Sequence, residues 1–198
     1  YEAGANRYLL RHETFNAEHY ESLHPAGLSA QKRQQCLWDL KEIGYQVGTG
    51  FMVGSPEQTA EHLAEDMLFI QKLNPQMVGI GPFIPHHDTP FAKKNAGTLE
   101  LTLFMLGLLR LTIPNVLLPA TTALGTIHPK GRELGILAGA NVVMPNLSPS
   151  DVRGDYLLYD NKLCTGEEAA ECRSELETRM NAIGYRVVTD RGDSLNRG

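Results

Sequence analysis

Polar side chains with chemical potential gather where apolar segments of the sequence end. The apolar residues at 8–10 run directly into Arg11, His12, Glu13 and Thr14. Four further apolar segments end in residues 50–57, in residues 82–89, in Thr121 and Thr122, and in Met144 and Asn146. Parallel α/β proteins bind ligands at the carboxyl ends of their strands. We therefore expect these groups to face one shared ligand cavity; the alternative is that each lies in a solvated surface loop.

A second candidate group follows the apolar segment that ends near residue 85. His86, His87 and Asp88 carry imidazole and carboxylate groups, which can ligate a metal ion. No histidine pair at i, i+4 spacing and no cysteine lies nearby in the sequence. A hydrogen-bonded loop is therefore the favoured interpretation of these residues.

The glycines at 48, 50 and 54 do not predict a dinucleotide-binding loop. Their spacing is G-x-G-x-x-x-G, and they lie inside an apolar segment, whereas the phosphate-binding loop joins a strand to a helix. Glycine within a strand more often allows another backbone or a ligand to come close. We expect that role here.

The chain has three cysteines, Cys36, Cys164 and Cys172. The odd count and the absence of a secretory pattern favour reduced thiols and a cytoplasmic location. Thiolates can hold zinc or an iron–sulfur cluster, but two neighbouring cysteines are too few for a closed site. We expect Cys36 to lie in the core, as free cysteines often do.

Apolar segments typical of buried strands alternate with segments of helical periodicity. The predicted strands are residues 7–13, 45–54, 76–85, 115–126 and 141–145, and the predicted helices are residues 29–44, 59–74, 98–113 and 129–140. Nearly continuous apolar strands between amphipathic helices predict a parallel sheet covered by helices. An open doubly wound sheet and a (β/α) barrel both fit this pattern. Five units are short for an eight-stranded barrel, which takes roughly 250 residues.

The helix patterns also predict caps and buried faces. Ser29 is expected to cap the first of these helices and Gly44 to end it. Its predicted apolar stripe is Cys36, Leu40 and Ile43, and that of the next helix is Ala60, Leu63, Ala64, Met67 and Leu68.

The character of the sequence changes after residue 150. The remainder is polar, with one predicted short helix at 167–182 and a tail at 189–198 that we expect to be disordered. We therefore expect two parts, residues 1–150 and a C-terminal extension, residues 151–198.

Composition excludes several functional classes. The net charge is −5 and the lysines and arginines are scattered, which speaks against nucleic-acid binding. No apolar run reaches the roughly 18 residues of a spanning helix. The chain begins at Tyr1 in residues that read like the end of an earlier helix, so we expect a fragment of a longer protein.

Five motifs, in order, resemble the radical S-adenosylmethionine (SAM) family. They are GANRYLLRHET, GFMVGSPEQT, MVGIGPFIPHHDTP, LPATTALGT and ANVVMPNLSPSDVRGDYLLY, which together cover roughly residues 1–165. The resemblance implies a (β/α) barrel with the cofactor at the strand ends. The strands here would be its fourth to eighth, so the fold class expected is α/β, a partial barrel of about five parallel strands.

The resemblance also implies roles for particular residues. Glu13 matches the carboxylate that holds the SAM ribose or amino group, and Arg33 matches an arginine that pairs with the SAM carboxylate. The segment with Met52 in the isoleucine place of G-x-I-x-G-x-x-E would lie beside the adenine. Further residues implied around SAM are Met144, Tyr156 and Tyr159, and those implied in a substrate or anion site are Arg11, Thr121 and Thr122. None of these is expected to act as a general acid or base.

The sequence departs from the family pattern in its cysteines. The C-x-x-x-C-x-x-C motif that binds the [4Fe–4S] cluster is absent, so this chain alone is not expected to cleave SAM. Some members carry an auxiliary cluster on three cysteines near the C-terminus. Cys164 and Cys172 match two of these, but Glu175 stands in the third place.

The resemblance implies a function for the whole protein. It would form a 5′-deoxyadenosyl radical from SAM and use it on a small sulfur compound or iron complex during [FeFe]-hydrogenase cluster assembly, with other hydrogenase maturases as partners. A biotin-synthase-like or methylornithine-synthase-like enzyme is one alternative. A non-catalytic half-barrel that binds or scaffolds is another. Unpaired sheet edges would make the isolated chain self-associate.

Overall fold

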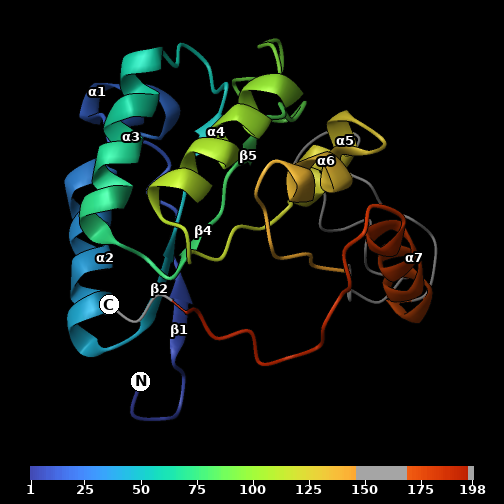
Figure 1. The fold of residues 1–198 in the computed structure, drawn as a ribbon. Coiled ribbons are helices and arrows are strands. Elements are labelled where there is room, and N and C mark those ends of the chain that lie inside the picture. Colours follow the sequence, from blue (N-terminus) through green and yellow to red (C-terminus); the bar gives the residue numbers. More distant parts are fainter. Residues whose placement is uncertain (146–168, 196–198) are drawn as a thin grey trace.

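The computed structural model describes residues 1–145 and 169–195, with side chains in the second range described from Arg173 onward. It has an α/β fold (Figure 1). The strands are β1 (Arg7–Leu9), β2 (Gln46–Thr49), β3 (Met52–Val53), β4 (Met77–Val78) and β5 (Gly81–Pro82). The helices are α1 (Ala17–Leu23), α2 (Ala30–Ile43), α3 (Ala60–Leu73), α4 (Leu99–Thr112), α5 (Thr122–Ile127), α6 (Gly131–Leu137) and α7 (Ala169–Ala182).

Every strand pairing among the described residues is parallel. One sheet has the order β1-β2-β4, and β3 pairs with β5 in a second. Isolated parallel bridges join Met77 to Leu117 and Pro119 to Val142. Five successive chain segments therefore lie side by side in the order of the sequence, and the predicted parallel arrangement is confirmed. The described strands do not close into a barrel.

The glycines of the second segment allow the close approach expected of them. A Cβ atom on Gly50 would lie 1.9 Å from the carbonyl oxygen of Gly79, and one on Gly54 would lie 2.5 Å from the Cα of Gly97. Either substitution would therefore force backbone apart. The first contact joins the second and third strand segments, and the second contact joins the end of β3 to the loop before α4.

The predicted ends of α2 are confirmed, and so is the burial of Leu40, but the rest of its predicted buried face is wrong. The Ser29 side chain accepts a hydrogen bond from the Lys32 amide, and Gly44 ends the helix in a left-handed conformation. Cys36 is exposed and Ile43 is 54% exposed, whereas Leu37 and Leu40 are buried. The buried face of α2 differs from the predicted one because Leu37 packs with Val47 of β2 and Phe69 of α3.

On α3 the buried face is also displaced from the predicted one. Leu63, Phe69, Ile70 and Leu73 are buried, while Leu68 is 65% exposed. The same face includes Asp66, whose side chain is fully buried. A carboxylate on an apolar helix face needs polar partners across the interface.

Two other segments differ from the prediction. The predicted strand 115–126 pairs only near its start, and its polar end forms helix α5 from Thr122 onward. The short helix α1, at Ala17–Leu23, was not predicted; Asn16 caps it by accepting a hydrogen bond from the His19 amide.

The C-terminal part packs on the rest of the molecule. On α7, Leu176 and Met180 join the main core, and Arg179 forms two hydrogen bonds of 2.7 Å with Glu133 of α6. The segment after α7 returns to the first strand (Figure 1), where Asp193 accepts a 2.6 Å bond from Arg7. The described part of the predicted disordered tail is therefore held against β1. The expected boundary at 150 lies outside the described residues.

No helix in the described part of the chain combines the length and apolar character needed to cross a membrane.

Candidate functional site

Glu13 sits where the first strand segment ends, in an unusual backbone conformation. Its φ is 70°, in the left-handed region, although its amide still donates to the Gly50 carbonyl at 3.1 Å. A non-glycine residue there costs about 1–3 kcal/mol and persists only where its surroundings impose it. Such strain concentrates at functional sites.

Two guanidinium groups flank the Glu13 carboxylate. Arg11 Nε and Arg33 Nη2, the latter from α2, each lie 3.9 Å from one of its oxygens. Arg33 Nε also donates to the Arg11 carbonyl at 2.5 Å, and Arg11 donates to the Phe51 carbonyl. The two ion pairs are too long for hydrogen bonds. The carboxylate is therefore held between two cations while its oxygens can still accept from a ligand.

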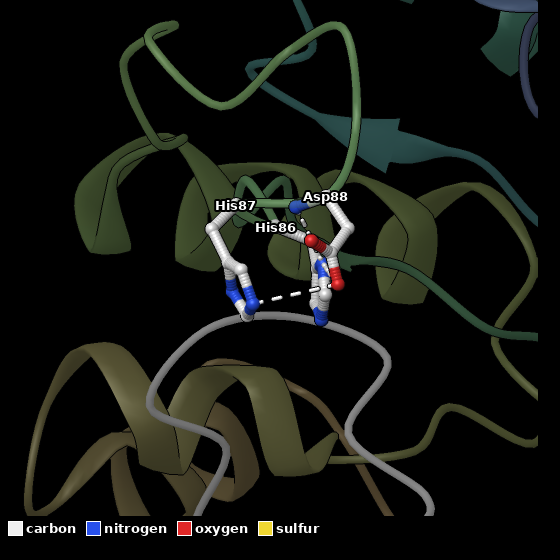
Figure 2. A group of neighbouring side chains, drawn as sticks. All are labelled: His86, His87 and Asp88. Carbon is white, nitrogen blue, oxygen red and sulfur yellow. Dashed lines mark hydrogen bonds and ion pairs between the residues drawn. The ribbon is translucent and has the colours of Figure 1, made fainter.

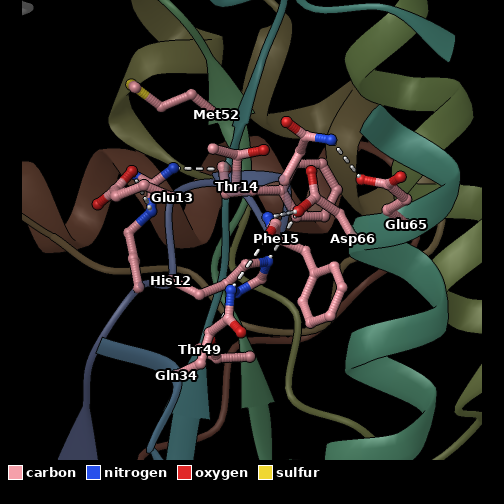
Figure 3. Close-up of polar contacts among 12 residues, drawn as sticks. His12, Glu13, Thr14, Phe15, Gln34, Thr49, Met52, Glu65 and Asp66 are labelled. Carbon is pink, nitrogen blue, oxygen red and sulfur yellow. Dashed lines mark hydrogen bonds and ion pairs between the residues drawn. The ribbon is translucent and has the colours of Figure 1, made fainter. Parts of the chain in front are cut away.

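The residues on either side of Glu13 are buried and polar (Figure 3). His12 contacts Thr49 Oγ1 through Nδ1 at 2.8 Å and donates from Nε2 to Asp66 Oδ1 at 3.1 Å. The Phe15 amide donates to the same Asp66 oxygen at 2.6 Å. Helix α3 thus bonds the chain both before and after Glu13.

Thr14 is held from another direction by His19 of α1. Its hydroxyl lies 3.1 Å from His19 Nδ1, and His19 Nε2 donates to the Pro56 carbonyl at 3.1 Å. Burial lowers the pKa of His19 below its ordinary value of 6.5, although the Pro56 hydrogen bond opposes this shift. A neutral ring fits the geometry, because Nδ1 can then accept from Thr14.

A cavity of about 420 Å³ opens beside this strand end. It is lined by Arg11, Met52, Gly81, Pro82, Phe83, Ile84, His86, Thr89, Phe91, Thr121, Thr122, Ala123 and Met144. These residues include members of each of the five predicted polar segment ends. The predicted convergence on one cavity is therefore confirmed for the described residues, while the ligand roles assigned to them remain predictions.

Two polar atoms beside this cavity have no hydrogen-bond partner among the described residues. They are Arg11 Nε and Thr121 Oγ1, and both are buried. Leaving a buried donor unpaired costs about 1–3 kcal/mol, more when it is charged. A cationic donor and a hydroxyl that both lack partners are suited to a small anionic ligand.

His86, His87 and Asp88 lie together in a turn (Figure 2), and of the three His86 lines the cavity. The three side chains place possible ligand atoms within 4.8 Å of one another, and His87 Nε2 lies 3.4 Å from Asp88 Oδ2. However, the Asp88 amide donates to His86 Nδ1 at 3.1 Å. A neutral imidazole that accepts at Nδ1 carries its proton on Nε2 and has no free lone pair for a metal. This geometry agrees with the hydrogen-bonded loop favoured from the sequence.

Several predicted residues cannot be compared with the structure. Tyr156, Tyr159, Cys164 and Asn146 lie outside the described residues. Cys172 belongs to α7 by its backbone alone. Glu175, also on α7, lies 3.8 Å from Arg179.

Sequence reasoning missed the residues that support the site from behind. The sequence pattern includes His12 only as one of four polar residues, and it does not point to Asp66. The signal that could have found Asp66 is its spacing, since it falls on the buried face of α3, between Leu63 and Ile70. Gln58 was also missed; its side chain bonds both the Gly54 amide and the Met52 carbonyl, at 2.6 and 2.8 Å.

Comparisons with known proteins agree with the sequence motifs. The chain is 51% identical over 191 residues to the [FeFe] hydrogenase maturase subunit HydE of Thermotoga maritima, covering 96% of this chain and 55% of that protein. It is 33% identical over 165 residues to 3-methylornithine synthase of Methanosarcina acetivorans, covering 82% of this chain and 45% of the relative. It is 31% identical over 147 residues to biotin synthase of Corynebacterium jeikeium, covering 72% and 40%. No family model matches the chain.

The fold has a solved counterpart. The crystal structure of methylornithine synthase (PylB) superposes with a TM-score of 0.73 at 25% sequence identity, covering 95% of this chain and 54% of that one. The chain thus spans about half the length of the relatives that it matches. These relatives are radical SAM proteins. The resemblance is therefore confirmed, and the chain belongs to the radical S-adenosylmethionine family as a relative of HydE.

Proposed function

We propose that this chain forms the C-terminal part of a HydE-like radical SAM enzyme that helps to assemble the active-site cluster of [FeFe] hydrogenase. Its described segments would be the fourth to eighth strands of a (β/α) barrel. The observation that carries the proposal is the position of Glu13 between Arg11 and Arg33, at 3.9 Å from each guanidinium. Of these three residues, Arg11 lines the cavity at the strand ends, and Glu13 and Arg33 do not.

In this proposal Glu13 and Arg33 bind and orient SAM. The Glu13 carboxylate accepts from the ribose hydroxyls or the amino group, and the Arg33 guanidinium pairs with the SAM carboxylate. Met144 lines the cavity together with Arg11 and would contact SAM through its side chain. Tyr156 and Tyr159 are proposed SAM contacts as well.

Arg11, Thr121 and Thr122 are proposed to hold the substrate. The unpaired Arg11 Nε and Thr121 Oγ1 would donate to a small anionic sulfur compound or to an anionic ligand of an iron complex. The apolar walls of the cavity, including Phe83 and Phe91, would exclude water from the radical chemistry.

The [4Fe–4S] cluster that supplies the electron for SAM cleavage would be bound elsewhere in the whole protein. The sequence has no C-x-x-x-C-x-x-C motif, and Cys36 is exposed on α2. An auxiliary cluster on Cys164 and Cys172 is a weaker proposal, since Glu175 fills the third position. The cytoplasm would keep these thiols reduced.

The remaining part of the barrel would cover the edge of β1. Tyr8 and Leu9 are 48% and 52% exposed there, and β1 pairs with β2 alone among the described strands. We propose that the chain by itself self-associates through this edge. Sedimentation of the isolated chain tests this, and a strictly monomeric mass at high concentration would contradict it. Partnership with other hydrogenase maturases is proposed for the whole protein only.

Calorimetric titration of SAM into the full-length protein, with its cluster reconstituted, tests the central proposal. We expect Glu13→Ala and Arg33→Ala to weaken binding at least tenfold, about 1.4 kcal/mol. Glu18→Ala and Lys32→Ala remove exposed charges nearby and should leave the affinity unchanged. If neither Glu13→Ala nor Arg33→Ala changes the SAM affinity, the alternative of a non-catalytic scaffold would be favoured. A preference for a long apolar acid over a small anion would instead favour a biotin-synthase-like enzyme.

A further inference from the structure

The left-handed conformation of Glu13 requires something to hold it, and the structure offers one group in the right place. Asp66 Oδ1 accepts from the His12 ring and from the Phe15 amide. These two donors lie one residue before Glu13 and two residues after it. A single carboxylate oxygen on α3 therefore fixes both sides of the strained residue.

His12 completes this arrangement by joining the helix to the sheet. Its ring is fully buried, packs edge-on against Phe69 of α3 at 4.9 Å between ring centres, and contacts Thr49 of β2 through Nδ1. If Nε2 donates to Asp66 Oδ1, which also accepts from the Phe15 amide, Nδ1 is left to accept from the Thr49 hydroxyl. In this arrangement the chain Thr49–His12–Asp66 joins β2 to α3 through one ring.

Burying this polar network costs free energy that apolar side chains in the same place would not cost. Both His12 and Asp66 are fully buried, and Asp66 Oδ2 has no hydrogen-bond partner among the described residues. Apolar residues of similar volume often stabilise a protein as well as a buried ion pair does. Its geometry suggests a different role, because its bonds converge on the backbone that carries Glu13.

We propose that His12 and Asp66 are positioning residues, which hold Glu13 left-handed so that its carboxylate lies between Arg11 and Arg33 and can receive SAM. This inference rests on the proposed function of Glu13. The side chains of His12 and Asp66 are fully buried, whereas the side chain of Glu13 is 17% exposed. They would act on SAM affinity entirely through Glu13.

A double-mutant cycle on the full-length, cluster-reconstituted protein tests this, with calorimetric SAM affinity as the readout. Asp66→Asn keeps the shape of the side chain and removes its charge. We expect it to weaken SAM binding about tenfold, the effect typical of residues that orient a ligand-binding group. In the Glu13→Ala background the same substitution should change the affinity no further, because nothing remains to be positioned.

Two further variants separate positioning from general destabilisation. His12→Gln removes the same support from the other partner and should reproduce the loss, also only when Glu13 is present. Thr102→Val is the control, on α4 and far from Glu13 in the sequence. It removes a buried hydroxyl that donates to the Thr98 carbonyl at 2.7 Å. It should lower the melting temperature without changing the SAM affinity of the folded protein.

The outcomes distinguish this inference from the proposed function. If Glu13→Ala leaves SAM affinity unchanged, the proposed function is wrong and the inference falls with it. If Glu13→Ala weakens binding but Asp66→Asn and His12→Gln do not, only the inference is wrong. Losses that add fully in the double variant would also overturn it, since His12 and Asp66 would then act independently of Glu13.

Discussion

Two polar groups follow strands in this protein, and they are built in opposite ways. Residues 11–15 are bonded to distant parts of the chain, since His12 contacts Thr49 and Asp66, 37 and 54 positions away (Figure 3). Residues 86–89 are bonded to one another, within two or three positions (Figure 2). In the first group His12 and Thr14 are buried, whereas His87 and Asp88 of the second are mostly exposed. Bonds to distant parts of the chain can impose a strained backbone conformation. A local turn instead adopts a backbone conformation that its own residues already favour.

The largest difference between the two groups should appear in stability. We expect His12→Ala to lower the free energy of unfolding by about 3 kcal/mol, because the buried Asp66 would lose one of its two donors and a cavity would replace the ring. Urea denaturation of the full-length protein, with constant m-value, measures this. A loss below about 1 kcal/mol would mean that the His12–Asp66 hydrogen bonds contribute little to the free energy of unfolding.

Glycine at position 13 isolates the strain itself. Glu13→Gly and Glu13→Ala both remove the carboxylate, but only glycine adopts a φ of 70° without a steric penalty. We therefore expect the glycine variant to be more stable than the alanine variant by about 1 kcal/mol. Equal stabilities would show that the backbone relaxes once the carboxylate is removed. Both variants should lose SAM affinity.

The Arg179–Glu133 ion pair joins α7 to α6. Like the contacts of residues 11–15 it is long-range, and like those of residues 86–89 it is partly exposed. Burial raises the pKa of Glu133, but the hydrogen bonds from Arg179 and from the backbone, together with the charges of Arg179 and Arg132, outweigh this. They leave the pKa of Glu133 below its ordinary value of 4.5. The folded state thus favours the charged form, so this contribution is present above pH 4.5 and is lost as the pH falls through the lowered pKa. We expect at most about 1 kcal/mol, because solvent screens the pair.

Comparing the wild type with Arg179→Met across pH 3–7 measures this contribution. The difference in unfolding free energy should shrink as the solution becomes acidic. A difference that grows on acidification would mean that the pKa of Glu133 is raised by folding, not lowered.

The smallest effects should come from the exposed turn. His87→Ala and Asp88→Ala should each change the free energy of unfolding by less than about 0.5 kcal/mol, as is usual for exposed residues. Added Zn²⁺ should not raise the melting temperature, because His86 already uses Nδ1 to accept from the Asp88 amide. A zinc-dependent rise that Asp88→Ala abolishes would instead reveal a metal site.

Much of the architecture could be predicted, but the packing faces could not. Alternating apolar and amphipathic segments predict parallel strands with covering helices, because each pattern reflects a local period. The caps at Ser29 and Gly44 are equally local. The predicted buried faces of α2 and α3 were right at Leu40 and Leu63 but wrong elsewhere, since Cys36 and Leu68 are exposed while Asp66 is buried. A helix face is decided by what the partner surface offers, and that information is spread over the whole chain.

By itself, the sequence determined which family this protein belongs to and which segment ends carry polar residues, because both are properties of short contiguous motifs. Only the tertiary structure decided how those residues act together. It brings Arg33 of α2 to Glu13, gathers Thr121 and Met144 around one cavity, and sets Asp66 behind the strained residue. These contacts join positions far apart in the chain, and their free energies depend on burial and distance, neither of which a linear pattern contains.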